Sequence, residues 1–162
     1  MDISNGEGLG VALFVQGCHF HCKNCFNKET WDFNGGKEFT MINALELLSP
    51  LYRPQYSRLS ILGGEPLEPD NILELTALCK FVKTYMPDKK IWLYTGHQIG
   101  SQIDFEDLII FKYVDVVVDG QYQDELKDMS YPWAGSANQR VIDVQKSLKS
   151  DNGEIVLWQS SN

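Results

Sequence analysis

The sequence predicts an α/β protein with a parallel sheet, formed as a single domain over residues 1–162. Short apolar runs alternate along the chain with segments of helical periodicity, and a polar, glycine-bearing stretch directly follows each of the first four apolar runs. Parallel neighbours need a long connection, which a helix supplies, so the alternation indicates β–α–β units with right-handed crossovers. With 43% hydrophobic residues, the chain can form one compact core.

The first half of the chain predicts two strands joined by a helix. The apolar, β-prone run Val11–Val15 ends at a Gln-Gly pair and opens into a cysteine-rich loop. Met41–Leu48 has helical spacing, and Thr40 is a suitable N-cap residue. Arg58–Leu62 is the next strand, and the sequence Gly-Gly-Glu-Pro (63–66) follows it at once.

The second half continues the alternation and then predicts a short β hairpin. Its longest helix keeps one face apolar from Ile72 to Val82, which is typical of a helix packed on a sheet. The expected elements are a helix from Asn71 to just before Pro87, a strand Lys90–Tyr94, a short helix Phe105–Phe111, a strand Val114–Val118, and hairpin strands Gln139–Val144 and Glu154–Trp158 around the loop Asp151–Gly153.

Four polar loops predict a ligand site at one edge of the sheet. The carboxyl ends of parallel strands share an edge, and ligands of α/β proteins bind there. The loops that follow the four strands are the cysteine loop, Gly63–Pro66, Tyr94–Gly96 and Asp119-Gly120. We therefore expect these loops to meet.

Composition argues against two classes of partner. The net charge is -8, the pI is about 4.8, and no run of Lys and Arg follows a phosphate backbone, so neither nucleic acid nor an anionic membrane is an expected partner. No apolar run approaches the roughly 20 residues of a membrane helix, and the first residues lack a signal-peptide pattern. The sequence is typical of a cytoplasmic protein.

Three of the four cysteines lie within eight positions. Cys18, Cys22 and Cys25 have the spacing C-x3-C-x2-C, which in a cytosolic protein favours metal or redox ligands over disulfides. An iron–sulfur cube held by three thiolates leaves one iron open, whereas a structural zinc ion takes four protein ligands. A loop histidine or Cys79 can complete a zinc site, so both interpretations stay open here. Cys79 itself falls on an apolar helix face, which favours core packing.

The cysteine motif combines with other segments into a family resemblance. C-x3-C-x2-C after the first strand, an aromatic residue directly after the last cysteine, and Gly-Gly-Glu-Pro after the second strand resemble the radical S-adenosylmethionine superfamily. Within it the chain is most similar to the activating proteins of anaerobic (class III) ribonucleotide reductases, over nearly its whole length. The segments that carry this similarity are Asn5–Gly8, Leu13–Cys18, Asn27–Trp31, Tyr94–Gly96, Val118–Gly120 and Gly135–Arg140.

The resemblance implies a fold and a chemistry. It implies a partial, laterally open (β/α) barrel of the radical SAM type, and 162 residues are indeed too few for a full barrel of about 250. It also implies that Cys18, Cys22 and Cys25 are the catalytic and metal-binding residues, which hold a [4Fe-4S] cluster whose open iron takes S-adenosylmethionine. Reductive cleavage would then generate a glycyl radical on the reductase.

Further residues are implied to bind the cofactor. Gly63 and Gly64 lack side chains, which would let the backbone approach the methionine moiety, with Glu65 nearby. Their alternative role is an ordinary strand-to-helix turn. The expected S-adenosylmethionine contacts are Asn24, Cys25, Phe26, Gly63, Gly64, Glu65, Tyr94 and Asp119.

The implied partners are the large subunit of an anaerobic ribonucleoside-triphosphate reductase with its C-terminal glycine loop, a low-potential electron donor such as flavodoxin, and a second copy of the chain in a homodimer. The segment Tyr131–Arg140 is a hypothetical contact with the reductase, although it also suits a plain surface connection. Two alternatives remain at this stage. One is another small radical enzyme, similar to a pyruvate formate-lyase activase or a deazapurine synthase. The other is a non-catalytic, zinc-stabilised α/β binding module.

Overall fold

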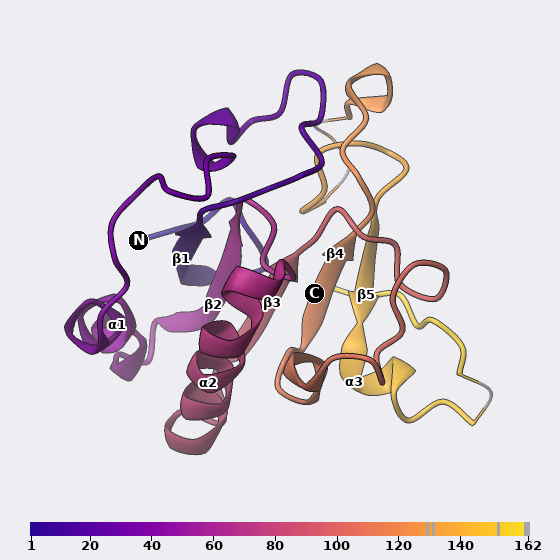
Figure 1. The fold of residues 1–162 in the computed structure, drawn as a ribbon. Coiled ribbons are helices and arrows are strands. Elements are labelled where there is room, and N and C mark those ends of the chain that lie inside the picture. Colours follow the sequence, from indigo (N-terminus) through magenta and orange to yellow (C-terminus); the bar gives the residue numbers. More distant parts are fainter. Residues whose placement is uncertain (129, 131, 152, 161–162) are drawn as a thin grey trace.

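A five-stranded sheet organises the protein. In the computed structural model, which describes residues 1–128, 130, 132–151 and 153–160, the strand order is the order of the chain (Figure 1). The first four strands are parallel, the fifth is antiparallel to the fourth, and the sheet does not close. The strands are β1 (Leu9–Val15), β2 (Tyr56–Gly63), β3 (Lys90–Tyr94), β4 (Val116–Asp119) and β5 (Arg140–Asp143).

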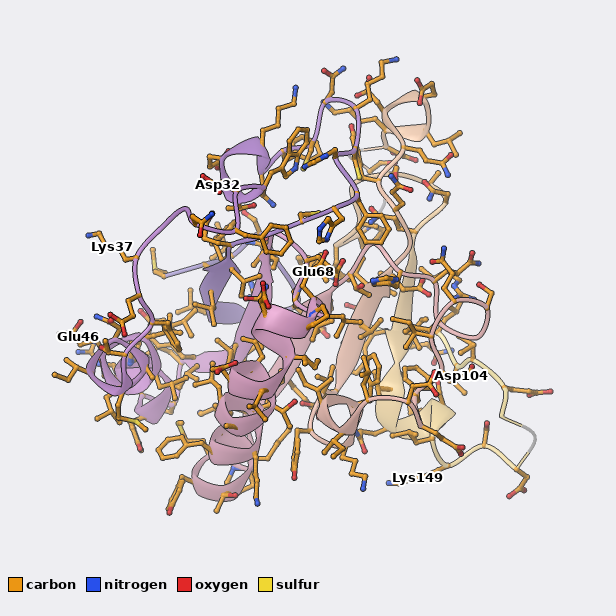
Figure 2. The ribbon with its side chains drawn as sticks, viewed as in Figure 1. Asp32, Lys37, Glu46, Glu68, Asp104 and Lys149 are labelled. Atoms are coloured by element: carbon orange, nitrogen blue, oxygen red, sulfur yellow. The ribbon has the colours of Figure 1, made fainter. Side chains whose placement is uncertain are left out.

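Helices cover one face of this sheet. Figure 1 shows α2 crossing in front of the middle strands, while charged side chains such as Lys37, Glu46 and Lys149 point outward (Figure 2). The predicted Thr40 cap is confirmed, since its hydroxyl accepts a hydrogen bond from the Asn43 amide. The α-helices are α1 (Met41–Leu48), α2 (Pro69–Tyr85) and α3 (Val144–Ser147), and short 3-10 turns are η1 (Lys28–Thr30), η2 (Ser49–Tyr52), η3 (Ile109–Lys112) and η4 (Asp124–Leu126).

The core lies between the helices and the sheet. Side chains alternate across a strand, so Leu59 and Ile61 of β2 face the helices with Leu93 of β3, and all three are fully buried. Cys79 of α2 is in the same core, which confirms its predicted packing role. None of the helices in the described ranges has the length and apolar character needed to cross a bilayer.

The opposite face of the sheet is covered by irregular chain. Trp92 of β3 lies there, with its ring centroid 5.9 Å from that of Trp133 and 5.8 Å from that of Trp158. The N-terminal segment also crosses this face, so close to it that a Cβ atom on Gly6 would lie 2.7 Å from the Trp92 ring.

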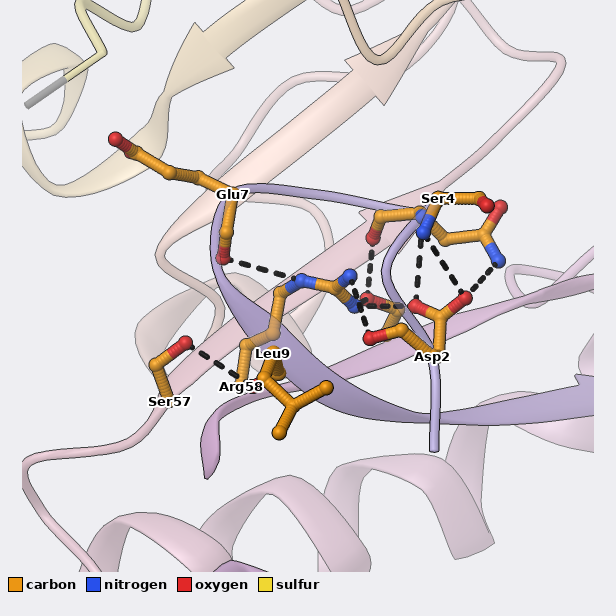
Figure 3. A network of polar contacts seen from close by, with 8 residues as sticks. Asp2, Ser4, Glu7, Leu9, Ser57 and Arg58 are labelled. Atoms are coloured by element: carbon orange, nitrogen blue, oxygen red, sulfur yellow. Dashed lines mark hydrogen bonds and ion pairs between the residues drawn. The ribbon is translucent and has the colours of Figure 1, made fainter. Parts of the chain in front are cut away.

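A buried arginine fastens the N-terminal segment to the sheet (Figure 3). Arg58 is fully buried; its guanidinium donates to the Asp2 carboxylate at 2.6 Å and to the Glu7 carbonyl at 3.2 Å. The neighbouring Ser60 hydroxyl donates to the Asn5 carbonyl. A buried charge needs such a partner, because the unpaired ion would lose its hydration without compensation. The network thus fixes the segment that precedes β1.

Several predicted elements need correction. The four parallel strands and the α/β class are confirmed, while the barrel geometry stays a prediction. The helix predicted at Phe105–Phe111 is wrong: the chain forms an aspartate turn, in which the Asp107 side chain accepts from the Asp104 amide, and then η3. The long helix begins at Pro69 rather than at Asn71, whose side chain instead donates to the Gln16 and Glu65 carbonyls.

The C-terminal hairpin is confirmed only in part. Its first strand is β5, which pairs with β4 and then runs into the unpredicted helix α3. The second segment returns antiparallel to β5 through one bridge, Ile142 to Leu157, without forming a regular strand. Asn152, at the centre of the predicted connecting loop, lies outside the described residues.

Candidate functional site

A cavity of about 630 Å³ lies at the carboxyl ends of the parallel strands. The cysteine loop and the chain that follows β4 rise above this edge of the sheet (Figure 1). The predicted meeting of the four loops is therefore confirmed in geometry, since each contributes to the cavity wall. The predicted site residues that line it are Cys18, Cys22, Cys25, Phe26, Gly63, Gly64, Glu65 and Tyr94.

Backbone hydrogen bonds hold the cysteine loop at its base. The Gly17 amide donates to the Thr30 carbonyl at 2.9 Å, and the Cys18 amide donates to the Trp31 carbonyl at 3.2 Å. The Gly17 carbonyl in turn accepts from the Glu65 amide at 2.7 Å. The three cysteines are free thiols, with Cys18 buried and the other two half-buried. Their loop is thus fixed by main-chain contacts that do not involve sulfur.

Gly64 allows the cysteine loop and the Gly-Gly-Glu-Pro loop to touch. A Cβ atom at this position would lie 2.4 Å from the Gly17 carbonyl oxygen and 2.9 Å from that of Thr30. Gly63 has φ +107°, a conformation that side chains disfavour. These glycines therefore have a structural reason to be present, and their backbone also borders the cavity.

Glu65 joins the loops after β2 and β3. Its carboxylate is 1% exposed and accepts from the Thr95 hydroxyl at 2.8 Å, the Gly96 amide at 2.8 Å and the Leu67 amide at 2.9 Å. Burial raises the pKa of Glu65 from its ordinary value of 4.5 to about 7, although these three donors act in the opposite direction. The residue is therefore a buried bridge with an unusual proton affinity.

This pKa predicts a pH-dependent stability that Glu65→Gln removes. The pKa of Glu65 is higher in the folded protein than in the unfolded chain, so the protonated side chain stabilises the fold. This stabilisation is fully present below pH 4.5 and is lost as pH rises through about 7. Between about pH 5.5 and about pH 8, we expect the free energy of unfolding to fall by about 2 kcal/mol more in the wild type than in Glu65→Gln. Urea denaturation of the cluster-free protein measures it, and equal pH slopes would contradict the prediction.

Aromatic side chains also line the cavity. Tyr94 is largely buried, and its hydroxyl has no hydrogen-bond partner in the part of the chain that the structure describes. Phe26 is 54% exposed, with its ring centroid 5.3 Å from that of Tyr122 and the Lys127 ammonium 5.1 Å from its face. The cavity therefore offers an open aromatic surface, while the unpaired Tyr94 hydroxyl is buried in the protein.

Two predicted contacts face away from the cavity. The Asn24 amide donates to the Asp124 carboxylate at 2.8 Å, on the protein surface. Asp119 is buried at the end of β4, where it accepts from the Ile99 amide at 2.8 Å and forms an ion pair with Arg140. Neither residue lines the cavity, so their structural contacts are clear while a role toward a cofactor stays a prediction.

Other lining residues were not predicted as cofactor contacts, although Thr95 and Gly96 belong to a loop that was expected at this edge. Phe20, Thr95, Gly96, Tyr122 and Trp133 all border the cavity. A signal existed for two of them, because the Thr-Gly pair ends a strand. Trp133 has φ +66° and packs on Trp92, so its segment lies partly inside the protein rather than only on the surface. Tyr131, the first residue of the hypothetical reductase contact, lies outside the described residues.

A second cavity of about 530 Å³ adjoins the first behind Phe20. Here the His19 ring lies 2.8 Å from the Glu68 carboxylate, which is placed just before α2 and below the cysteine loop (Figure 2). Burial lowers the pKa of His97, whose ring packs on Phe20 at 4.9 Å. Among the residues that the structure describes, no three His, Cys, Asp or Glu side chains form a site for a single metal ion.

Comparison with known proteins assigns the chain to a family. The family model described as a 4Fe-4S single cluster domain matches residues 4–142. Proteins named anaerobic ribonucleoside-triphosphate reductase-activating protein are similar over most of the chain. The relative from Enterobacteria phage T4 is 41% identical over 140 residues, 86% of this chain and 87% of that protein. The chain belongs to the family of anaerobic ribonucleoside-triphosphate reductase-activating proteins.

Bacterial members of this activating-protein family are almost as similar. The relative from Vibrio cholerae is 38% identical and that from Escherichia coli K12 is 35% identical, each over 143 residues, 87% of this chain and 92% of the relative. No solved structure gives a significant match. Family membership supports an iron–sulfur cluster, in place of the zinc interpretation that the sequence left open.

The cysteine loop of this activating protein fits such a cluster. Three thiols border one roomy cavity, and soft thiolate ligands are those that iron–sulfur clusters take. Burial raises the pKa of Cys18 and of Cys22, and binding to iron would release their protons. Main-chain bonds anchor the base of this loop at Gly17 and Cys18.

Proposed function

We propose that this activating protein reductively cleaves S-adenosylmethionine and generates a glycyl radical on an anaerobic ribonucleotide reductase. The single observation that carries the proposal is the position of Cys18, Cys22 and Cys25 on one cavity wall together with Gly63, Gly64 and Tyr94. Three thiolates leave one iron of a cube open, and a cavity of about 630 Å³ has room for a nucleoside-sized ligand beside it.

The protein's own part in this chemistry is to bind and orient. Once bound at Cys18, Cys22 and Cys25 and reduced, a [4Fe-4S] cluster would supply one electron to the sulfonium. Cleavage would give methionine and a 5′-deoxyadenosyl radical, which would take a Cα hydrogen from the reductase. Gly63 and Gly64 bring backbone close to the methionine end, and the buried Glu65 holds their loop in place. The exposed Phe26 ring suits the planar part of the nucleoside, and Tyr94 contributes to the same cavity wall.

The proposal includes the partners that the reaction requires. The names of the relatives point to the reductase, whose glycine-bearing loop would be the hydrogen donor. Each turnover consumes one electron, so a low-potential donor such as flavodoxin completes the stoichiometry. We place the reaction in the cytoplasm.

An anaerobic assay tests the proposal. The protein is reconstituted with iron and sulfide, reduced, and mixed with S-adenosylmethionine, with and without an anaerobic ribonucleotide reductase. We expect 5′-deoxyadenosine and, with the reductase, the doublet of a glycyl radical in electron paramagnetic resonance. Cleavage without a reductase radical would favour another small radical enzyme. A protein that binds no iron–sulfur cluster and forms no 5′-deoxyadenosine would refute the proposed function.

A further inference from the structure

The outer edge of β1 offers backbone groups for pairing. On this side Gly10 exchanges two hydrogen bonds of 2.8 Å with Asp2. Backbone groups alternate in direction along a strand, so the amide and carbonyl groups of Ala12 and Phe14 point the same way as those of Gly10. Within the described ranges of the chain, no hydrogen bond reaches these four groups. The outer edge of β1 is therefore paired at Gly10 and unpaired at Ala12 and Phe14.

Beyond the register shift between Leu9 and Gly10, this edge lacks the usual protection against pairing. Natural edge strands carry charges, prolines or bulges that block another strand, or they are covered by other chain. The β1 sequence Leu-Gly-Val-Ala-Leu-Phe-Val has no charge and no proline. At the opposite edge of the sheet, the returning C-terminal segment covers β5. The Asp143 amide donates to the Val156 carbonyl, and the Trp158 amide donates to the Val141 carbonyl. Ala12 and Phe14 are therefore the place where the sheet can accept another strand.

The same edge is continuous with the cysteine-lined cavity. The Phe14 side chain is 47% exposed and forms part of the cavity wall. Only Val15, Gln16 and Gly17 separate it from Cys18 along the chain. An extended peptide beside β1 would consequently pass the mouth of the cavity that holds the three thiols.

We propose that the glycine-bearing segment of the reductase adds to the sheet as an extended strand beside Ala12 and Phe14. The proposal rests on the proposed function, in which the reacting group is a main-chain Cα–H. A glycine has no side chain to recognise, whereas strand addition recognises the backbone itself and fixes its orientation. Two free residues offer at most four hydrogen bonds. This suits a short, transient segment better than a stable dimer, whose interface buries about 1,600 Å².

The variant Ala12→Pro tests the edge without altering the ladder to β2. Proline removes the outward amide and places its ring where the incoming carbonyl would bind, and such a change is tolerated at an edge. We expect reductase binding and glycyl radical yield to fall by at least about tenfold. Cleavage of S-adenosylmethionine without the reductase should be unchanged, because Ala12 does not line the cavity. Ala12→Ser, which keeps both backbone groups, should behave as the wild type.

Hydrogen exchange of the unmodified protein gives a second readout. On addition of the full-length reductase, the amides of Ala12 and Phe14 should gain protection, measured in the peptide that spans β1. Unchanged exchange there, or wild-type reductase affinity in Ala12→Pro, would overturn the inference. Protection that depends on protein concentration without reductase would assign the edge to a second copy of the chain instead. Failure of the wild type to cleave S-adenosylmethionine would refute the proposed function, while binding and exchange would still report on the edge.

Discussion

Cys22→Ala is expected to lose both the iron–sulfur cluster and all cleavage of S-adenosylmethionine. The substitution leaves two thiolates in a loop that must hold three irons, so the iron content after reconstitution should fall to background. Loss of a residue behind a metal ligand already costs about 10- to 100-fold in affinity or activity, so removal of a ligand itself should exceed that range. Cys22 is half-buried and its loop is anchored by backbone bonds, so the fold should survive.

Cys79→Ala is the matched control for this prediction. It removes a thiol that is fully buried in α2, within the core beneath the sheet, where burial raises its pKa to about 12. We expect a loss of about 1 kcal/mol in the free energy of unfolding, with unchanged iron content and activity. Iron and sulfide analysis with an assay of 5′-deoxyadenosine checks both variants. A Cys22→Ala protein that still binds a full cluster would contradict the assignment of the ligands.

Gly64→Ala is the second change for which we expect a large effect. Its new methyl group would lie 2.4 Å from the Gly17 carbonyl oxygen, and the atoms it meets belong to backbone, which cannot rotate away. The cysteine loop must therefore move, and a displacement of about 1 Å is enough to cost roughly 100-fold in rate. We expect that loss in 5′-deoxyadenosine formation, together with a destabilisation of about 1–3 kcal/mol from overpacking.

Gly153→Ala separates this steric effect from the general cost of replacing a glycine. Gly153 has φ +66°, and in the part of the chain that the structure describes no atom beyond its two neighbours lies within 4 Å of an added Cβ atom, so the change should cost only about 1–2 kcal/mol of backbone strain. Its rate of cleavage should equal that of the wild type. Normal activity of the Gly64→Ala protein would contradict the prediction, because it would mean that the cysteine loop and the Gly63–Pro66 loop are farther apart than in the structure.

The parts of the site that could be predicted are those where a local pattern has one structural meaning. A β-prone run followed by glycine marks the carboxyl end of a strand, and parallel pairing brings such ends together, so the cysteine loop and Gly64 were expected to meet. Apolar periodicity, by contrast, reports burial rather than conformation. Phe111 is buried, yet its segment is a turn, in which the Asp107 side chain accepts a hydrogen bond from the Asp104 amide, rather than the predicted helix.

Most features of the site that were not predicted depend on contacts between residues far apart in the sequence. Asn24 pairs with Asp124, one hundred residues further on, and Asp119 is held by Arg140 from the next strand. Such partners depend on how loops of different strands approach one another, which residue spacing does not encode. For the same reason, the sequence could not show that Trp133 packs against Trp92, which lies in a strand far from it along the chain.

The order of the strands bears on how the protein matures. Because the spatial order of the strands is also their order in the chain, each new strand can add to the one synthesised before it, and the sheet can grow during translation. The cysteine loop is made early, but its bond from the Glu65 amide to the Gly17 carbonyl forms only after β2 is made, and the wall that contains Tyr122 and Trp133 is made later still. Loading of iron and sulfide should therefore follow synthesis of the chain through β4 and the loop beyond it.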